Sequence, residues 1–298
     1  MRAIQVRQHQ ASVEIRTSVW QDEVLPFTLA HPAAVLPLRR TKLVFSALVV
    51  GSVMPDVPYF ATLADNIRWG HSLRGVFFFC LPVGLALLWL FHSVVKRPLA
   101  ALAPDYVRVR ISPEELDFRF GPWRQFLLIV GSLLIGTFSH ILWDGFTHDH
   151  GYFVKNWEWL SLPVVSPLIT RNHHMPLWRS LQHWCSVVGV LVVIVTTLWW
   201  WIRKPVLANP VPQQFTPTRR IQIFAVGFLL AAAIGVVAAL TTEGHHYWKW
   251  LLVKMTIVFI SAVCAEVFLF SLAWQLRHRK KEKPPDRQVR GLNVPAER

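Results

Sequence analysis

The segment that decides the fold covers residues 126–150 and reads FLLIVGSLLIGTFSHILWDGFTHDH. Its first half is almost pure hydrocarbon, whereas its second half carries three histidines and two aspartates. Four further apolar segments of similar length are residues 76–95, 185–202, 221–240 and 251–272. About 20 apolar residues are enough for a helix to cross a bilayer, and a helix satisfies its own backbone groups in lipid. The sequence therefore predicts an all-α polytopic membrane protein with about five transmembrane helices.

The composition agrees with a membrane protein, because 53% of the residues are hydrophobic and only 16% are charged. Soluble domains have about 45–50% apolar and about 25% charged residues. Cys80, Cys185 and Cys264 lie in or beside apolar segments, so we expect neither a disulfide framework nor a cysteine-type zinc site. The net charge of +14 is gathered in particular loops. We therefore expect the lipid bilayer, and no nucleic acid, as a partner.

The basic residues of the loops indicate the orientation of the chain. Five spans place three regions rich in Lys and Arg on one side, namely residues 96–124, 203–220 and the C-terminal tail. The opposite side receives regions poorer in basic residues, namely 56–75, 143–184 and 241–250. Loops rich in Lys and Arg stay in the cytoplasm, so the pattern predicts a cytoplasmic C-terminus.

The N-terminal apolar region, residues 27–56, permits two arrangements. A short helical hairpin would return both His31 and Asp56 to the outer side, with Pro32 at a first helical position. This arrangement places the basic residues of the hairpin tip well inside the bilayer. Alternatively, a single tilted span over residues 43–63 would leave His31 on the inner side and Asp56 within the membrane. We expect the hairpin and keep the single span as the alternative.

A set of polar residues ends the apolar segments on the outer side. His140 and Asp144 are four residues apart, so they lie on one helical face, and His148 continues this face if the helix persists beyond Gly145. Asp56 and His71 also stand at ends of apolar segments and are expected at the same depth. Ionisable groups near a membrane segment are costly and usually functional.

Imidazole and carboxylate ligands without thiolate suit zinc, manganese or iron, and we expect zinc or manganese. Helix capping remains the alternative role for Ser72 and Asp144, and Asp149 and His150 are expected to be solvated loop residues.

Four stretches carry a resemblance to a known family: LPFTLAHPAAVLPLRR (25–40), ALVVGSVMPDVPYF (47–60), HSLRGVFFFCLPVGL (71–85) and SHILWDGFTHDHG (139–151). Together they resemble the bacterial membrane proteins known as domain of unknown function 4184, over nearly the whole chain. The order of these motifs is also similar, more weakly, to membrane-bound metal-dependent hydrolases. That similarity implies metal ligands among six residues: His31, Asp56, His71, His140, Asp144 and His148. The family resemblance implies a place in the bacterial inner membrane.

The expected organisation has three parts. Residues 1–24 are polar and are expected to be a poorly ordered extension, residues 25–275 a helical membrane domain, and residues 276–298 a basic cytoplasmic tail. The candidate site residues are concentrated in residues 31–148 of the membrane domain.

Three functions fit these features. The first is a metal-dependent hydrolase that acts on a lipid or phosphoester at the outer face, with Asp144 and Asp56 as catalytic ligand or base. The second is a non-catalytic membrane scaffold, in which the polar residues hold helices together. The third is a transporter coupled to protons or ions, in which the histidines and aspartates relay them.

Overall fold

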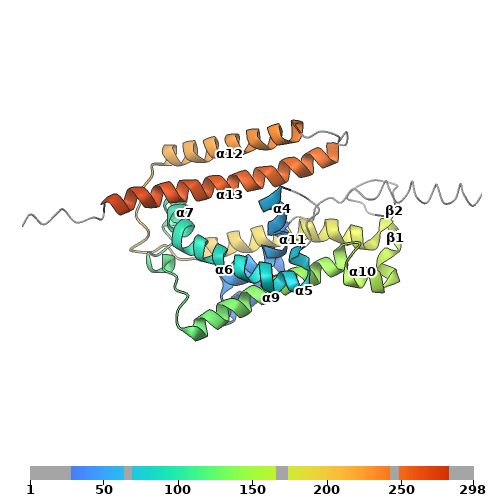
Figure 1. Cartoon of the computed structure of the whole chain (residues 1–298). Helices are drawn as coiled ribbons and strands as arrows, with labels where there is room; N and C mark the ends of the chain where they lie inside the picture. Colours follow the sequence, from blue (N-terminus) through green and yellow to red (C-terminus); the bar gives the residue numbers. More distant parts are fainter. Residues whose placement is uncertain (1–27, 64–68, 166–173, 242–247, 282–298) are drawn as a thin grey trace, which may run out of the picture.

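Long helices dominate the described part of the chain (Figure 1). The computed structural model describes residues 28–63, 69–165, 174–241 and 248–281, and only the backbone of 248–250 and 279–281. The five candidate membrane spans are Leu73–Leu102, Trp123–Thr147, Leu177–Arg203, Pro217–Leu240 and Leu251–His278. Each is long and apolar enough to cross a membrane, which confirms the predicted polytopic helical class. Four of the helices are α9 (Trp123–Thr147), α11 (Leu177–Arg203), α12 (Pro217–Leu240) and α13 (Trp248–Lys281).

The first span is one helical run with two wider turns. It consists of α5 (Leu73–Gly75), η5 (Val76–Cys80), α6 (Leu81–Leu90), η6 (Phe91–Val95) and α7 (Lys96–Leu102). Both η5 and η6 are π-helical turns, and each precedes a proline, Pro82 or Pro98. Because proline has no backbone N–H, it interrupts the regular hydrogen-bond ladder, and a π-helical turn accommodates the interruption.

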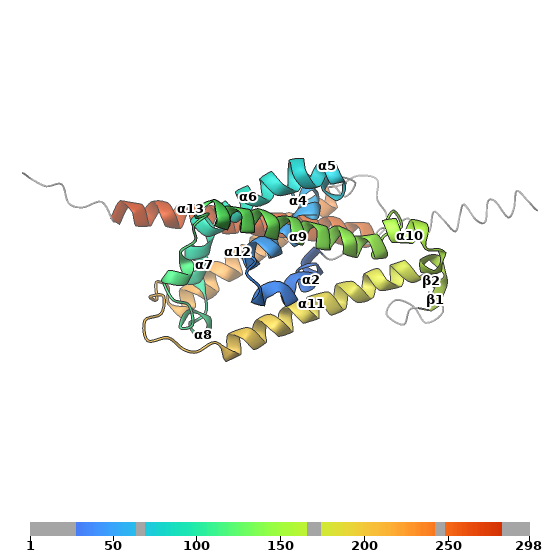
Figure 2. The ribbon, with the colours of Figure 1, turned by 90° about the horizontal axis from the view of Figure 1, so that it is seen from below.

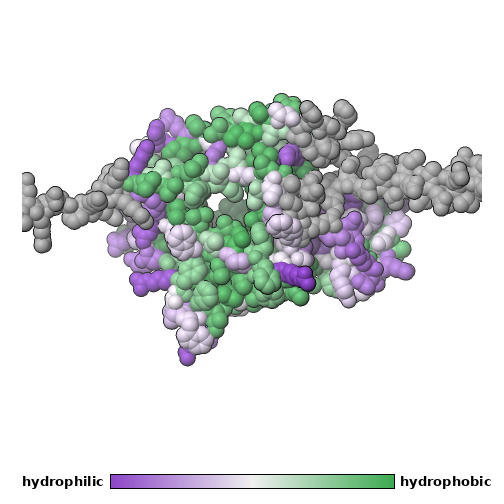
Figure 3. Space-filling model, in the orientation of Figure 1, coloured by the Kyte–Doolittle hydropathy of each residue, from purple (hydrophilic) through white to green (hydrophobic). Residues whose placement is uncertain are grey.

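The surface of the molecule has the pattern of a membrane protein. Figure 3 shows a hydrophobic band in the middle and hydrophilic residues gathered towards both ends. Large apolar side chains of the candidate spans are exposed, such as Val195 at 60% and Leu229 at 65%. Monomeric soluble proteins rarely expose contiguous apolar surface of this extent, so lipid is the natural cover for this band.

The N-terminal region forms the predicted hairpin. Its first arm contains η1 (Thr28–Ala30), α2 (Pro32–Val35) and η2 (Leu36–Arg40), and its second arm contains α3 (Phe45–Val53), η3 (Met54–Asp56) and α4 (Val57–Thr62). Figure 2 shows the first arm between α9 and α11. His31 and Asp56 both contact the same group of polar side chains, so the alternative of a single span with His31 on the opposite side is wrong.

The basic tip of the hairpin avoids the middle of the bilayer. The guanidinium of Arg39 lies 5.7 Å from the ring centroid of Trp199, and that of Arg203 lies 4.5 Å from the same ring. Trp199 is in the last turns of α11, which ends at Arg203. The tip therefore lies near the end of a span, where its charges can reach the polar interface.

Close contact between α3 and α9 forms the centre of the bundle. A Cβ atom placed on Gly51 would lie 2.2 Å from the carbonyl oxygen of Leu133, and one on Gly136 would lie 2.3 Å from that of Leu48. Small residues permit such close approach of helix backbones in membranes. The buried cluster beside this contact consists of Ala47, Leu88, Ile129 and Leu133.

Short elements cover the two ends of the bundle. At the basic end lie α8 (Asp105–Arg108) and η7 (Glu114–Leu116), and at the other end lie η4 (Trp69–His71), α10 (Tyr152–Asn156) and η8 (Glu158–Ser161). Strands β1 (Pro163–Val165) and β2 (His174–Pro176) pair antiparallel and form the only sheet in the described residues. The predicted extension, residues 1–24, lies outside the described residues. Of the predicted tail, residues 276–281 are still helical, and the rest lies outside the described part.

Candidate metal centre

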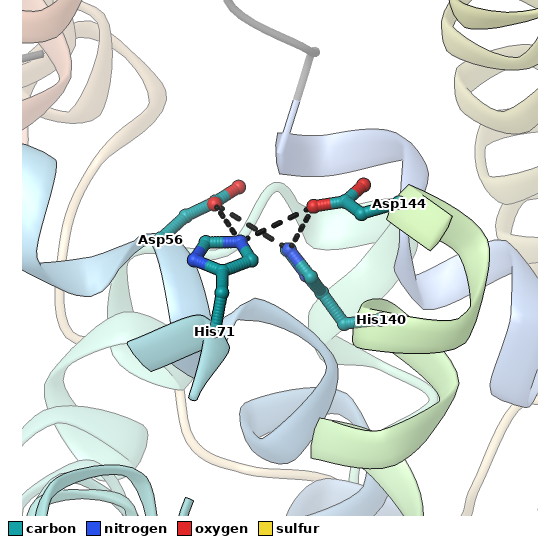
Figure 4. A group of neighbouring side chains, drawn as sticks. All are labelled: Asp56, His71, His140 and Asp144. Atoms are coloured by element: carbon teal, nitrogen blue, oxygen red, sulfur yellow. Dashed lines mark hydrogen bonds and ion pairs between the residues drawn. The ribbon is translucent and has the colours of Figure 1, made fainter. Parts of the chain in front are cut away.

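Four of the predicted site residues converge at one end of the bundle. Asp56 ends η3, His71 ends η4, and His140 and Asp144 lie one turn apart on α9. Each offers one ligand atom, and these atoms all lie within 4.8 Å of one another. Figure 4 shows the two imidazoles directed towards the two carboxylates from separate parts of the chain. The structure therefore brings together Asp56, His71, His140 and Asp144.

The four ligand atoms have the spacing of a metal coordination shell. The Nε2 atom of His71 lies 3.4 Å from Asp56 Oδ1 and 3.2 Å from Asp144 Oδ2. The Nε2 atom of His140 lies 3.4 Å and 3.1 Å from the same two oxygens. Ligand atoms at about 2.0–2.1 Å from a tetrahedral zinc ion lie about 3.3–3.4 Å from one another. These four of the six separations therefore lie close to the values around a zinc-sized ion, and all six lie within 4.8 Å.

The orientation of His140 is set by the backbone of α3. Its Nδ1 lies 2.8 Å from the carbonyl oxygen of Ser52, which can only accept, so Nδ1 carries the proton and donates. In the neutral imidazole, the lone pair of Nε2 then faces Asp56 and Asp144. Metal-binding histidines usually have such a second hydrogen bond, which fixes the tautomer and the ring.

Two buried atoms of the group lack a hydrogen-bond partner. His140 Nε2 and Asp56 Oδ1 lie within ion-pair distance of each other, yet neither makes a hydrogen bond within the described residues. His140 and Asp56 are 0% and 1% exposed. Buried polar atoms nearly always have a partner, so an unsatisfied nitrogen lone pair beside an unsatisfied carboxylate oxygen fits a site for a cation. The residues present thus fit a divalent metal.

The electrostatics at the rim of the group differ between its two histidines. Burial alone would lower the pKa of His71, but its close contacts with the carboxylates of Asp144 and Asp56 outweigh burial and raise that pKa. For His148, burial dominates and lowers the pKa. Protons therefore compete with a metal ion for Nε2 of His71 as the pH falls. His148, in contrast, stays neutral down to a lower pH.

His31 lies beside the four residues, on the outer oxygen of Asp144. Its Nε2 atom is 3.0 Å from Asp144 Oδ1, and its Nδ1 atom is 3.3 Å from the carbonyl oxygen of Thr28. The imidazole of His31 stacks on that of His140, with ring centroids 3.7 Å apart and planes 14° apart. His31 is thus in contact with the site but does not belong to the group of four converging ligand atoms.

His148 occupies a supporting position. It caps α9 with an extended backbone, and its Nδ1 lies 3.3 Å from the carbonyl oxygen of Asp144 and 3.5 Å from Asp144 Oδ1. Its Nε2 lies 3.3 Å from the amide nitrogen of Gln182. Because Nδ1 faces a carbonyl, it carries the proton, and Nε2 is free to accept from Gln182. In this arrangement His148 positions the end of α9, and its role as a ligand stays a prediction.

The neighbouring polar residues have simpler roles. Ser72 caps the first span, since its hydroxyl accepts from the backbone N–H of Gly75 at 2.9 Å. The capping alternative therefore holds for Ser72, whereas the side chain of Asp144 faces the histidines. Asp149 pairs with His150 at 2.8 Å, with side chains 60% and 29% exposed, as expected for a solvated loop.

Sequence reasoning missed three residues that support the site. Thr28 donates its hydroxyl to Asp56 Oδ2 at 2.7 Å, Ser52 offers its carbonyl to His140, and Gln182 contacts His148. A signal for the helix contact was present, because Ser132, Gly136 and His140 follow one another at intervals of four. Small residues with this spacing form the contact face of membrane helices. Thr28 and Gln182 had no comparable signal.

The apolar helices and the buried cluster of histidine and aspartate define a polytopic membrane protein with a candidate metal site. The family model described as Domain of unknown function (DUF4184) matches residues 25–272, and the chain belongs to this family. No curated protein and no solved structure matches the chain. The similarity to membrane-bound metal-dependent hydrolases stays a prediction.

Proposed function

We propose that this protein is a metal-dependent hydrolase that acts on a lipid or phosphoester at the outer face of the bacterial inner membrane. The observation that carries the proposal is the buried Nε2 atom of His140, which makes no hydrogen bond within the described residues and faces carboxylate oxygens of Asp56 and Asp144. Asp56, His71, His140 and Asp144 would hold the ion. Two imidazoles and two carboxylates suit zinc or manganese.

A metal bound here would supply a water of lowered pKa, which is a nucleophile near neutral pH. The chain's own residues support this chemistry by position. Thr28 holds Oδ2 of Asp56 at 2.7 Å, so the other oxygen of Asp56 faces the histidines. Asp144 has its Oδ1 directed towards His31, and this oxygen is the candidate acceptor for a proton. Asp144 and Asp56 are therefore the proposed catalytic carboxylates.

The location of the site supports a substrate at a membrane surface. The end of the bundle that carries the site also exposes large aromatic side chains, including Trp69 at 68%, Tyr152 at 71% and Trp159 at 50%. Tryptophan and tyrosine concentrate at the interface between lipid and water. The loops at the opposite end are richer in Lys and Arg, which by the positive-inside rule supports a site on the outer side and a cytoplasmic C-terminus.

A hydrolase assay tests this proposal. The purified protein is incubated in mixed micelles with phospholipids and with a soluble phosphoester, and the products are followed after EDTA treatment and after addition of Zn²⁺ or Mn²⁺. We expect hydrolysis that EDTA removes and that added metal restores. His140→Ala should be inactive and His150→Ala active, because the half-buried His150 pairs with Asp149 and lies beside His148 at the rim of the site. Hydrolysis that is unaffected by EDTA and by His140→Ala would contradict the proposal.

A scaffold remains the second candidate, because the same residues also join helices. The hydrogen bond from His140 to Ser52 and the one from Thr137 to Gly51, at 3.2 Å, link α9 to α3. In a scaffold, alanine at His140 and Asp144 lowers stability and changes no ligand. Loss of a bound metal from a variant that stays folded distinguishes the hydrolase from the scaffold.

A further inference from the structure

We propose that Asp144 bridges two metal ions, with the second ion held between Asp144 Oδ1 and His31 Nε2. This inference rests on the proposed metal site and extends it to a two-metal centre. The oxygen Oδ2 of Asp144 faces the four-ligand site, through contacts of 3.1 Å with His140 and 3.2 Å with His71. The other oxygen, Oδ1, faces away from these residues and lies 3.0 Å from His31.

The tautomer of His31 leaves a lone pair directed at Asp144. The Nδ1 atom of His31 lies beside the carbonyl oxygen of Thr28, which can only accept, so Nδ1 carries the proton. The Nε2 atom then presents a lone pair to a carboxylate oxygen 3.0 Å away. Two lone pairs at this distance repel unless a cation lies between them. The cation is either a proton on Nε2 or a metal ion.

The geometry of the paired imidazoles favours a metal. His31 and His140 are stacked and nearly parallel, with ring centroids 3.7 Å apart, and each directs its Nε2 at a different oxygen of Asp144. Metal ions in two-metal sites are about 3.5–4 Å apart. The two parallel imidazoles are 3.7 Å apart, and each faces one oxygen of the same carboxylate. They are therefore suited to bind two adjacent ions, one each.

The burial of these residues strengthens the argument. His31, His140 and Asp144 are 2%, 0% and 5% exposed. Both imidazoles also have their Nδ1 atoms fixed by backbone carbonyl oxygens, Thr28 for His31 and Ser52 for His140. Such outer hydrogen bonds orient metal ligands. The imidazoles that face the two oxygens of Asp144 are thus both oriented by a hydrogen bond to the backbone.

The proposed site of the second ion has few protein ligands within the described residues. The open coordination positions of such an ion indicate the class of substrate. Among the described residues, His31 and Asp144 face this site directly, while Nδ1 of His148 lies 3.5 Å from the same oxygen and is engaged with the backbone. An ion with open positions can take water or substrate oxygens. Two adjacent metal ions suit phosphoester hydrolysis, because they stabilise the attacking and the leaving oxygen together. We therefore assign a phosphoester as the substrate of the two-metal site.

Manganese titration tests this inference without relying on activity. Detergent-purified, metal-stripped protein is loaded with Mn²⁺, the bound metal per chain is measured, and the electron paramagnetic resonance spectrum is recorded. We expect about two ions per chain and a spin-coupled spectrum for the wild type. His31→Gln should bind one ion and give the spectrum of an isolated Mn²⁺, and its amide can donate to Asp144 Oδ1 in place of the second ion, which preserves the fold. His150→Ala, the control, should behave like the wild type.

The outcomes separate the two proposals. One uncoupled ion per chain in both the wild type and His31→Gln overturns the bridging role of Asp144 and leaves the four-ligand site intact. No bound ion in the wild type overturns the proposed metal site itself. If His31→Gln loses its folded elution profile in size-exclusion chromatography, the wild-type spectrum alone decides, because a single uncoupled ion there also contradicts the second position.

Discussion

The Nδ1 atom of His140 donates to the carbonyl oxygen of Ser52 at 2.8 Å, across the contact between α9 and α3. This bond depends on the close approach of two backbones at Gly51 and Gly136. It determines which nitrogen of His140 faces the carboxylates of Asp56 and Asp144. The packing of two apolar helices thereby sets the chemistry of the site.

Gly136→Ala should therefore damage both stability and metal binding. The new Cβ would lie 2.3 Å from the carbonyl oxygen of Leu48, so the helices must separate and the bond to Ser52 must lengthen. We expect a loss of about 1–3 kcal/mol of stability, as for other overpacked cores. The change is measured as the midpoint of thermal unfolding in detergent, together with bound metal per chain.

Gly131→Ala is the matched control on the same helix, because a Cβ there meets nothing within 4 Å. This variant should keep its metal and be as stable as the wild type, or slightly more stable, since alanine favours helix over glycine. Equal behaviour of the two variants would contradict the role of the α3–α9 contact.

Metal affinity should fall as the pH is lowered. Metal ligands must be deprotonated, and the close carboxylates of Asp144 and Asp56 outweigh burial and raise the pKa of His71 above its ordinary value. The protonated His71 stabilises the metal-free fold fully below the unfolded pKa of about 6.5. This contribution is lost as the pH rises through the raised pKa of His71. The affinity for the metal increases over the same pH range, because fewer protons have to be displaced. Calorimetric titrations with Zn²⁺ at several pH values should show weaker binding at acidic pH. A Zn²⁺ affinity that does not change with pH would contradict this prediction.

A second polar cluster, at the basic end, should affect stability alone. Asp105 Oδ1 accepts from Arg220 at 2.8 Å and from Arg108 at 3.2 Å, and the two arginines are only 5% and 9% exposed. Asp105→Ala leaves two buried cations without this carboxylate, so we expect a lower unfolding temperature and unchanged metal content.

The pH dependence of this cluster has a defined sign. The hydrogen bond from Arg220 lowers the pKa of Asp105, so its stabilising contribution is present above about pH 4 and is lost at more acidic pH. Asp117→Ala is the control, because Asp117 and Arg97 form an exposed pair. A larger effect for Asp117→Ala than for Asp105→Ala would contradict this account.

The proposed orientation predicts which ends of the spans face outward. In a variant without its three native cysteines, Tyr152→Cys on α10 and Glu114→Cys in η7 are each labelled with a membrane-impermeant maleimide on intact cells. We expect labelling of residue 152 from outside and labelling of residue 114 only after lysis. The reverse pattern would place the metal centre on the cytoplasmic side.

The sequence predicted the spans and most of the site for identifiable reasons. The length of the apolar segments predicted the five spans. The helices extend beyond these segments where polar residues such as Arg179 or Arg203 continue them. The interval of four residues placed His140 and Asp144 on one face. The convergence of Asp56 and His71 was expected from their shared depth in the membrane.

Details that depend on tertiary packing were beyond reach of the sequence. The hairpin was expected, but the single span stayed open as an alternative. The groups that contact the basic tip of the hairpin, such as Trp199, come from a helix far away in the sequence. The six candidate ligands looked equivalent, yet four converge, while His31 and His148 contact the outer oxygen of Asp144. Tautomers depend on backbone carbonyls such as that of Ser52, which no residue type reveals.

Metal content in the detergent-purified protein tests the central claim most directly. The wild type, His140→Ala and His92→Ala are saturated with Zn²⁺, freed of excess metal and measured by mass spectrometry. His92 is a matched control, since it is also a buried histidine of a membrane span, but it contacts Ser46 and Phe118 away from the site. We predict bound zinc in the wild type and in His92→Ala, and its loss in a folded His140→Ala. Equal zinc in all three proteins, or none in the wild type, would contradict a metal centre at Asp56, His71, His140 and Asp144.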